Sequence, residues 1–145
     1  MKELSRRNKY WIDKHRYYEL KHFCLQYPLW KKAYIELCTV MRKNPDVNAY
    51  IHGSEVIDST ADIASARVYF SSRMGLVQSI AMEADDEIGN YIFEAVTKGL
   101  SFDTLKTVYE IPCGKDLYYD RYRKFFWLLS NARDEIPYAD TRKRC

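Results

Sequence analysis

Apolar residues recur at three- and four-residue steps along much of the chain, and this spacing places them on one face of a helix. The first such run covers residues 14–27, and Asp13 precedes it as an N-cap. The second covers residues 28–42, with Pro28 in its first turn, where the missing N–H of proline costs nothing. We expect these helices to form an antiparallel or angled pair. Their inward faces are Tyr17, Leu20, Cys24 and Tyr27, and Trp30, Ala33, Tyr34, Leu37 and Met41.

The periodicity is lost over residues 44–60, which contain the turn-forming sequences Asn-Pro-Asp and His-Gly-Ser. A long apolar face returns over residues 61–84, with Thr60 as its cap. The pattern thus divides the chain into an N-terminal helix pair over residues 1–43, a linker over 44–60 and a helical domain over 61–145. The inward face of the long helix is Ile63, Ala66, Phe70, Val77, Ile80 and Ala84.

The last third contains shorter helices separated by capping residues. The acidic run Asp85 to Glu87 favours a helix start through the helix dipole, and the helix that it opens, over 86–98, is closed by Gly99. Two helices joined by a short turn and braced by a third form a helix-turn-helix, which we place at about 86–131. The sequence therefore predicts an all-α fold. The remaining elements are a Ser101 cap, a short helix over 102–108, a turn over 109–113 and a final helix over 114–131.

The final helix carries its charges and tyrosines in its first turns and its most apolar residues in its last turns. In a helix-turn-helix, the last helix enters the major groove with its N-terminal residues at the base edges. Its later turns then belong to the core, here through the inward stripe of Tyr118, Tyr122, Phe125 and Leu129. The residues that we assign to DNA contact are Lys115, Asp116, Tyr119, Asp120, Arg123, Lys106, Arg121 and Lys124.

These residue types match the chemistry of the groove. Lys115 and Arg123 can donate to guanine acceptors or to phosphates, and Asp116 can accept from the amino group of cytosine. Tyr119 can pack on a thymine methyl or donate its hydroxyl to a phosphate. On spacing alone, an amphipathic helix with solvated charges explains the same pattern. The residues expected to hold phosphates and set the orientation are Arg121, Lys124 and Lys106.

The run TLKTVYEIPCGKDLYYDRYRKFFWLL resembles the C-terminal helix-turn-helix of the RinA/ArpU group of small phage-encoded transcriptional regulators. That group is in turn similar to the promoter-reading fourth region of sigma factors. The resemblance covers Asp85 to Leu129 and includes a small residue at Gly114, where the family pattern more often has serine. It implies a phage or prophage regulator that binds double-stranded DNA and contacts host RNA polymerase. The N-terminal run KYWIDKHRYYELKHFCLQYPLWKKAY resembles small uncharacterised proteins of Gram-positive prophages.

Charge is unevenly distributed behind the net value of +3. Residues 1–43 carry 11 Lys and Arg against 4 Asp and Glu, residues 44–100 carry 3 against 9, and residues 101–145 carry 9 against 7. A basic N-terminal part beside an acidic middle indicates an anionic partner for the first, or internal pairing between the two.

Several classes of protein do not fit the chain. No apolar run approaches the roughly 20 residues of a membrane span. The N-terminus MKELSRRNKYW lacks the apolar core of a secretory signal, so we expect no membrane and a cytoplasmic protein. The resemblance to phage proteins implies that the cell is a host bacterium. The 4 Cys and 3 His show no metal-ligand spacing, and no catalytic motif is present. We therefore expect no enzyme, no metal and no cofactor.

A second hypothesis is a protein-interaction module that never reads DNA. Residues 101–145 carry little net charge, and the chain has 13 Tyr and 3 Trp, residue types that anchor interfaces. Such a module would bind a polymerase subunit, or inhibit a host nucleic-acid-binding defence complex. A homodimer fits either hypothesis, because many helix-turn-helix proteins read two half-sites. Trp127 and Leu128 lie off the inward stripe and would form the dimer contact or pack against the 61–84 helix.

Overall fold

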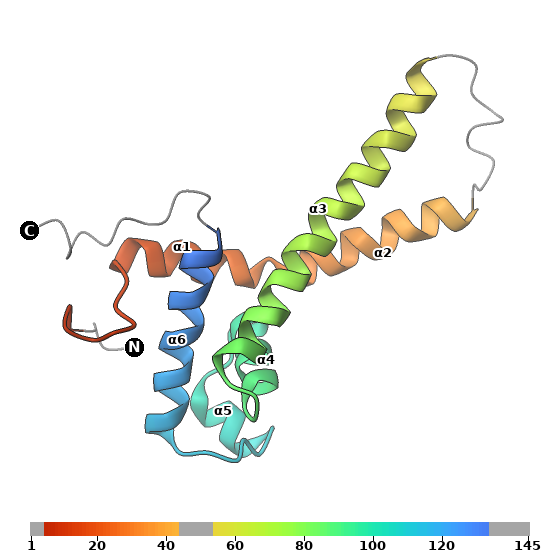
Figure 1. Cartoon of the computed structure of the whole chain (residues 1–145). Helices are drawn as coiled ribbons and strands as arrows, with labels where there is room; N and C mark the ends of the chain where they lie inside the picture. The colour runs from red at the N-terminus through yellow and green to blue at the C-terminus, as the bar shows by residue number, and fades with distance from the viewer. Residues whose placement is uncertain (1–4, 44–53, 134–145) are drawn as a thin grey trace, which may run out of the picture. The chain divides into compact units, whose positions relative to one another are not determined.

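The computed structural model describes residues 5–43 and 54–133, with side chains over 5–41 and 60–133. The described residues form helices and no strand, which confirms the all-α prediction. The chain forms two compact units: a first unit of residues 1–25 and 77–145, and a second unit of residues 26–76. The helices are α1 (Lys14–Leu25), α2 (Tyr27–Lys43), α3 (Ser54–Ala84), α4 (Gly89–Lys98), α5 (Phe102–Thr107) and α6 (Lys115–Arg133), as labelled in Figure 1.

The first unit contains α1, the end of α3, and the helices α4, α5 and α6. Helix α1 packs against α4 and α6, and α4 packs against α5 and α6. Helix α6 begins beside α5, where the rings of Tyr118 and Phe102 are 5.3 Å apart (Figure 1). It ends beside α1, where Arg16 donates to the hydroxyl and the carbonyl of Ser130. The most deeply buried apolar side chains of this unit are Leu20, Cys24, Val77, Ala81, Ile92, Leu105, Phe125 and Leu129.

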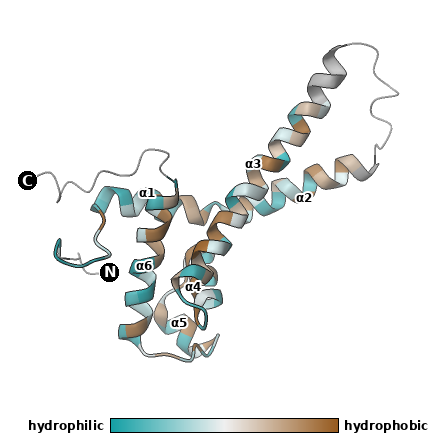
Figure 2. Ribbon diagram, in the orientation of Figure 1, coloured by the Kyte–Doolittle hydropathy of each residue, from teal (hydrophilic) through white to brown (hydrophobic). Residues whose placement is uncertain are grey.

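Helix α6 has the division of polar and apolar residues that its sequence predicts. Figure 2 shows hydrophilic residues over its middle turns and hydrophobic residues toward its end. Of the predicted inward stripe, Tyr118, Phe125 and Leu129 are buried and Tyr122 is half-buried. Trp127 lies at the side of this stripe, and its ring contacts that of Tyr10 at 5.7 Å. The N-terminal segment, residues 5–13 before α1, therefore covers part of α6.

Three helix ends are fixed by the local signals that the sequence predicts. Asp13 caps α1, because its Oδ1 accepts from the backbone N–H two residues on at 2.9 Å. Gly99 ends α4 in the left-handed conformation, with φ of 70°, and its N–H donates to the Ala95 carbonyl. Ser101 caps α5, because its hydroxyl accepts from the N–H three residues on at 3.2 Å.

The start of α4 is later than predicted. The residues before it form a turn, in which Oδ1 of Asp85 accepts from the N–H groups of Glu87 (2.8 Å) and Ile88 (2.9 Å). The helix begins at Gly89, where a Cβ atom would lie 2.8 Å from the carbonyl oxygen of Ala81 in α3. The acidic residues therefore close a tight corner between α3 and α4 rather than occupying the first turn of α4.

The predicted linker and domain borders also need correction. Helix α3 begins at Ser54, so residues 54–60 are helical, whereas residues 44–53 lie outside the described residues. No glycine or proline occurs between Gly53 and Gly75, so nothing in the sequence interrupts the earlier turns of α3. Helix α1 belongs to the first unit and α2 to the second, so residues 1–43 do not form one unit. The pairing of α1 with α2 stays a prediction.

The second unit consists of α2 and the part of α3 before residue 77. Among its described side chains, only Tyr27 and Trp30 are buried. The guanidinium of Arg67 lies 5.8 Å from the ring centre of Tyr34, which links α3 to α2. This unit leaves many large apolar side chains in solvent: Leu29, Ile35, Val40, Met41, Val68 and Tyr69 are all exposed. None of the described helices is long and apolar enough to cross a bilayer.

Candidate nucleic-acid interface

The connection between α5 and α6 is held by its own backbone and by one lysine. Residues 108–114 form it, which is longer than the three- to four-residue turn of the standard motif. Ile111 is buried, and its N–H donates to the carbonyl of Leu105 at 3.1 Å. The Nζ of Lys106 lies 3.4 Å from the carbonyl oxygens of both Ile111 and Cys113. Lys106, predicted to hold a phosphate, is thus bound to the loop, although its side chain is still exposed.

The first turn of α6 faces solvent. The carbonyl of Gly114 accepts from the N–H of Tyr118 at 3.1 Å, so Gly114 is the N-cap. A Cβ atom at Gly114 would meet nothing within 4 Å, so no close packing requires a glycine there. Lys115 and Asp116, the first two predicted contacts, are both exposed.

The next predicted contacts are closer to the protein interior. Tyr119 is half-buried, and its ring centre lies 5.1 Å from that of Tyr118, 6.2 Å from that of Tyr122 and 6.4 Å from that of Phe102. Its ring is therefore part of an aromatic cluster, and its contact with DNA stays a prediction. Arg123 is half-buried, and its Nε is buried without a hydrogen-bond partner in the described part of the chain. Lys124 is half-buried.

Arg121 is held by two carboxylates of the protein itself. Its Nε lies 3.0 Å from Oδ2 of Asp85, and its Nη1 lies 2.6 Å from Oδ2 of Asp120. Burial opposes ionisation of Asp85, but the bonds from Ile88 N–H, from the Arg121 guanidinium and from Glu87 N–H outweigh it and lower the pKa of this carboxyl. Arg121 and Asp120 were predicted to meet DNA, whereas here Arg121 joins α6 to the corner between α3 and α4, and Asp120 pairs with Arg121 within α6.

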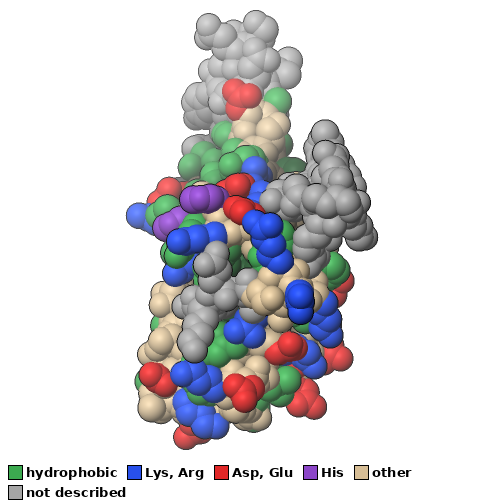
Figure 3. All heavy atoms as spheres, turned by 90° about the vertical axis from the view of Figure 1, so that its left-hand side faces the viewer, with side chains coloured by type: hydrophobic (Ala, Val, Ile, Leu, Met, Phe, Trp, Pro, Cys, Tyr) green, Lys and Arg blue, Asp and Glu red, His purple; other side chains and the backbone are tan. Residues whose placement is uncertain are grey.

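Positive and negative side chains are mixed along the exposed side of α6. Its basic residues that form no ion pair with the described residues are Lys115, Arg123 and Lys124, and its acidic residues are Asp116 and Asp120. Figure 3 shows Lys and Arg side chains interspersed with Asp and Glu over the lower part of the face that it draws. A mixed surface of this kind attracts a polyanion less strongly than a continuous basic patch does.

Two features of this region were missed by reasoning from the sequence. Leu117 is 44% exposed beside Lys115 and Asp116, so the opening of α6 offers an apolar side chain as well as charges. The helical period alone signals it, because Leu117 lies off the inward stripe. The bond between Asp85 and Arg121 joins residues 36 positions apart, and no local pattern could have indicated it.

No group of three or more His, Cys, Asp or Glu side chains in the described residues could hold a metal ion.

No protein-family model matches the sequence, and no curated protein or solved structure is significantly similar to it.

Proposed function

We propose that the protein is a DNA-binding transcriptional regulator of phage or prophage origin, in which α4, α5 and α6 act as a helix-turn-helix. The observation that supports this proposal is the course of α6. Its first turn carries the exposed side chains of Lys115 and Asp116. Its later turns, with Phe125 and Leu129, are buried in the core of the first unit. A recognition helix needs both properties, because it must reach a groove while its far end is anchored.

The readout would come from the first turn of α6. Lys115 would donate to guanine or to a phosphate, Asp116 would accept from a cytosine amino group, and Leu117 would contact a thymine methyl. Arg123 and Lys124, two turns later, would lie against the phosphate backbone. Arg121 would act indirectly, because its bond to Asp85 fixes the orientation of α6.

The test is selection of bound duplexes from a random pool by the full chain at near-physiological salt. We expect an enriched motif, and we expect Lys115→Ala to reduce affinity for it by about 1–3 kcal/mol if this residue reads a base. Asp116→Asn should change the preference at one position of the motif. Lys98→Ala is the matched control, since Lys98 lies at the end of α4 and pairs with Glu94.

The outcomes separate base reading from charge attraction. If Lys115→Ala lowers affinity equally for all DNA sequences, Lys115 contacts a phosphate rather than a base. If no motif is enriched and binding does not change with salt, the proposal is wrong, because phosphate contacts always release counterions.

A second candidate function, a protein-interaction module, is favoured by the second unit. Its exposed apolar residues include Leu29, Ile35 and Val68, with 67%, 53% and 63% of their surfaces exposed. Exposed apolar surface on paired helices is typical of an interface with another protein. The partner would be a polymerase subunit, a host defence complex or a second copy of this chain.

Capture from host lysate, with and without nuclease, tests this candidate. A single host protein retained after nuclease treatment, and lost with Ile35→Glu plus Val68→Glu, would favour it. Sedimentation of the purified chain shows whether a second copy is the partner. If the double variant captures the same protein as the wild type, the second unit is not the interface.

A further inference from the structure

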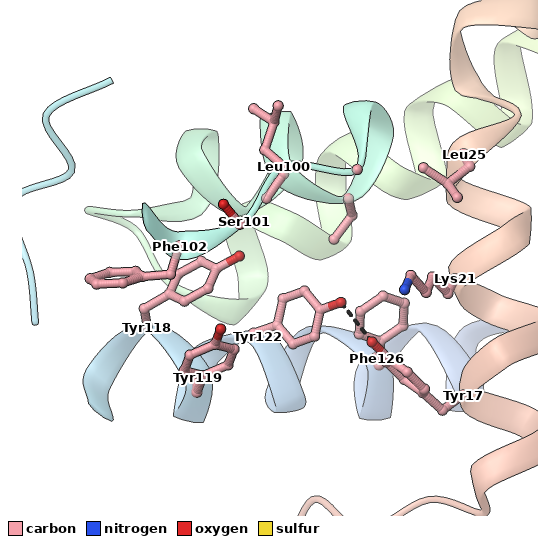
Figure 4. Close-up of a pocket in the computed structure, with 13 residues that line it drawn as sticks. Tyr17, Lys21, Leu25, Leu100, Ser101, Phe102, Tyr118, Tyr119, Tyr122 and Phe126 are labelled. Carbon is pink, nitrogen blue, oxygen red and sulfur yellow. Dashed lines mark hydrogen bonds between the residues drawn. The ribbon is translucent and has the colours of Figure 1, made fainter. Parts of the chain in front are cut away.

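The first unit contains a cavity of about 300 Å³ that the DNA-binding proposal does not use. It lies between α1, the connection from α4 to α5, and the first half of α6 (Figure 4). Its walls therefore come from three segments that are distant in the sequence and packed together in one unit. The lining residues that matter here are Tyr17, Lys21, Phe102, Tyr118, Tyr119, Tyr122 and Phe126.

The cavity is walled mainly by aromatic rings. The rings of Tyr17 and Phe126 are 5.0 Å apart and those of Tyr122 and Phe126 are 4.9 Å apart, both in edge-to-face geometry. Tyr118 closes the opposite end, 5.3 Å from Phe102. Ring clusters of this kind offer faces and edges to a further flat ring, which gains from offset stacking as well as from apolar burial.

The polar groups of the cavity are hydroxyls and a single ammonium. The hydroxyls of Tyr17 and Tyr122 share a hydrogen bond of 2.8 Å. Burial raises the pKa of the Tyr17, Tyr118 and Tyr122 hydroxyls, so all three stay neutral and can donate at physiological pH. No Asp or Glu of the described residues lines the cavity, and the charged side chain among its lining residues is that of Lys21. Figure 4 shows the amino group of Lys21 pointing from α1 toward Tyr122 and Phe126.

We propose that this cavity binds a small planar aromatic anion, with its ring among the tyrosines and its anionic group at Lys21. The volume is at the lower limit of ligand pockets, which span about 300–1,000 Å³, so the ligand is a single-ring compound rather than a nucleotide. An aromatic cage without Lys21 would suit a cation. The ammonium reverses that preference, and an uncharged ring would leave it without a counterion.

This inference does not depend on DNA binding. The cavity is separate from the exposed Lys115 and Asp116, and ligand binding is measured directly on the full chain. A protein that binds the ligand but no DNA would refute the proposed function alone.

The experiment is calorimetric titration of the full chain with salicylate. Two related compounds test its chemistry: salicylamide keeps the ring and lacks the charge, and cyclohexanecarboxylate keeps the charge and lacks the flat ring. We expect saturable binding of salicylate, with each related compound weaker by about tenfold or more, the loss expected for one charge-assisted hydrogen bond or one ring stack.

Variants place the binding in the cavity. Lys21→Met should weaken salicylate by about tenfold or more, and Lys21→Arg should restore most of the affinity, because it returns the charge. Lys14→Met is the matched control on the same helix, since Lys14 is exposed and does not line the cavity. Thermal unfolding of each variant shows that the first unit is intact. Equal binding by wild type and Lys21→Met, equal binding of salicylamide, or no saturable binding to the folded chain would each overturn the proposal.

Discussion

Asp85 is expected to stabilise the first unit through both oxygens of one carboxylate. Its Oδ1 accepts two backbone N–H groups at the corner between α3 and α4, at 2.8 and 2.9 Å, and its Oδ2 accepts from Arg121 of α6 at 3.0 Å. Asp85→Ala removes both the acceptor for the backbone N–H groups of the corner and the ion pair with Arg121. Asp85→Asn keeps an acceptor oxygen for the corner and removes the ion pair. The two substitutions therefore separate the two contributions.

The magnitudes follow from the exposure of the groups. Loss of the side-chain oxygen that accepts the backbone N–H groups at the corner should cost about 1 kcal/mol, as the loss of a helix cap does. The side chains of Asp85 and Arg121 are 16% and 31% exposed, so solvent screens their pairing, and we take about 0.5–1 kcal/mol for it. Asp85→Asn and Arg121→Met should then each cost about 0.5–1 kcal/mol, and Asp85→Ala about 1.5–2 kcal/mol. The double variant Asp85→Asn with Arg121→Met should cost little more than either single one.

The same contacts make stability depend on pH. Because the pKa of Asp85 is lowered in the folded chain, the unfolded chain binds the proton more readily. The contribution of Asp85 is therefore complete above the ordinary carboxyl pKa of about 4 and is lost as pH falls through the folded value. Asp85→Asn should remove this part of the acid sensitivity.

The assay is urea unfolding at neutral and acidic pH, followed by circular dichroism and by tryptophan fluorescence. The reasoning fails if Asp85→Asn costs as much as Asp85→Ala, since the corner would then need the charge rather than an acceptor oxygen. It also fails if Arg121→Met leaves stability unchanged at neutral pH. Loss of DNA affinity by folded Arg121→Met with no loss of stability would return Arg121 to its predicted role at a phosphate.

Three further experiments test the packing of the first unit. Gly89→Ala should cost about 1–3 kcal/mol in urea unfolding, because its Cβ would lie 2.8 Å from a backbone oxygen of α3. Gly75→Ala, inside α3 with open space at its Cβ, is the control and should not destabilise the chain. Tyr122→Phe should lower the free energy of unfolding by about 1 kcal/mol, because it leaves the Tyr17 hydroxyl without its partner. The double variant Tyr17→Phe with Tyr122→Phe should lower it by less than the sum of the two single changes. Cys24, fully buried and with its pKa raised to about 12 by burial, should resist thiol reagents in the native chain and react after unfolding; rapid native labelling in a variant that retains only Cys24 would contradict this.

The parts of the fold that the sequence predicts correctly are those fixed by local chemistry. Asp13, Gly99 and Ser101 each end or begin a helix through bonds to residues within a few positions, so the side chain itself carries the information. The stripe on α6 is likewise a property of one helix. Such features do not depend on what packs against them.

The parts that the sequence does not predict depend on contacts between distant residues. The delayed start of α4 follows from the close approach of Gly89 to α3, and the removal of Arg121 from the predicted interface follows from Asp85. The packing of α1 against α4 and α6 in one unit is also a matter of tertiary contacts. Of the predicted contacts, Lys115 and Asp116 are exposed as expected, and Tyr119 belongs to the aromatic cluster.

The salt dependence of DNA binding can show how much of the interface lies on α6. Within the described residues, the basic side chains in the first three turns of α6 that form no ion pair are Lys115, Arg123 and Lys124. With about three phosphates neutralised, the slope of log K against log salt should be near −2.7, at about −0.9 for each phosphate. A much steeper slope would mean that basic residues outside α6 also meet the backbone, and the N-terminal segment, whose Arg7 and Lys9 are exposed, belongs to the same unit. Repeating the salt titration with the double variant Arg7→Ala plus Lys9→Ala shows whether the interface lies on α6 alone or includes the N-terminal segment. A slope that becomes shallower by about two phosphate equivalents would assign the segment to the interface, and an unchanged slope would leave the contacts with α6.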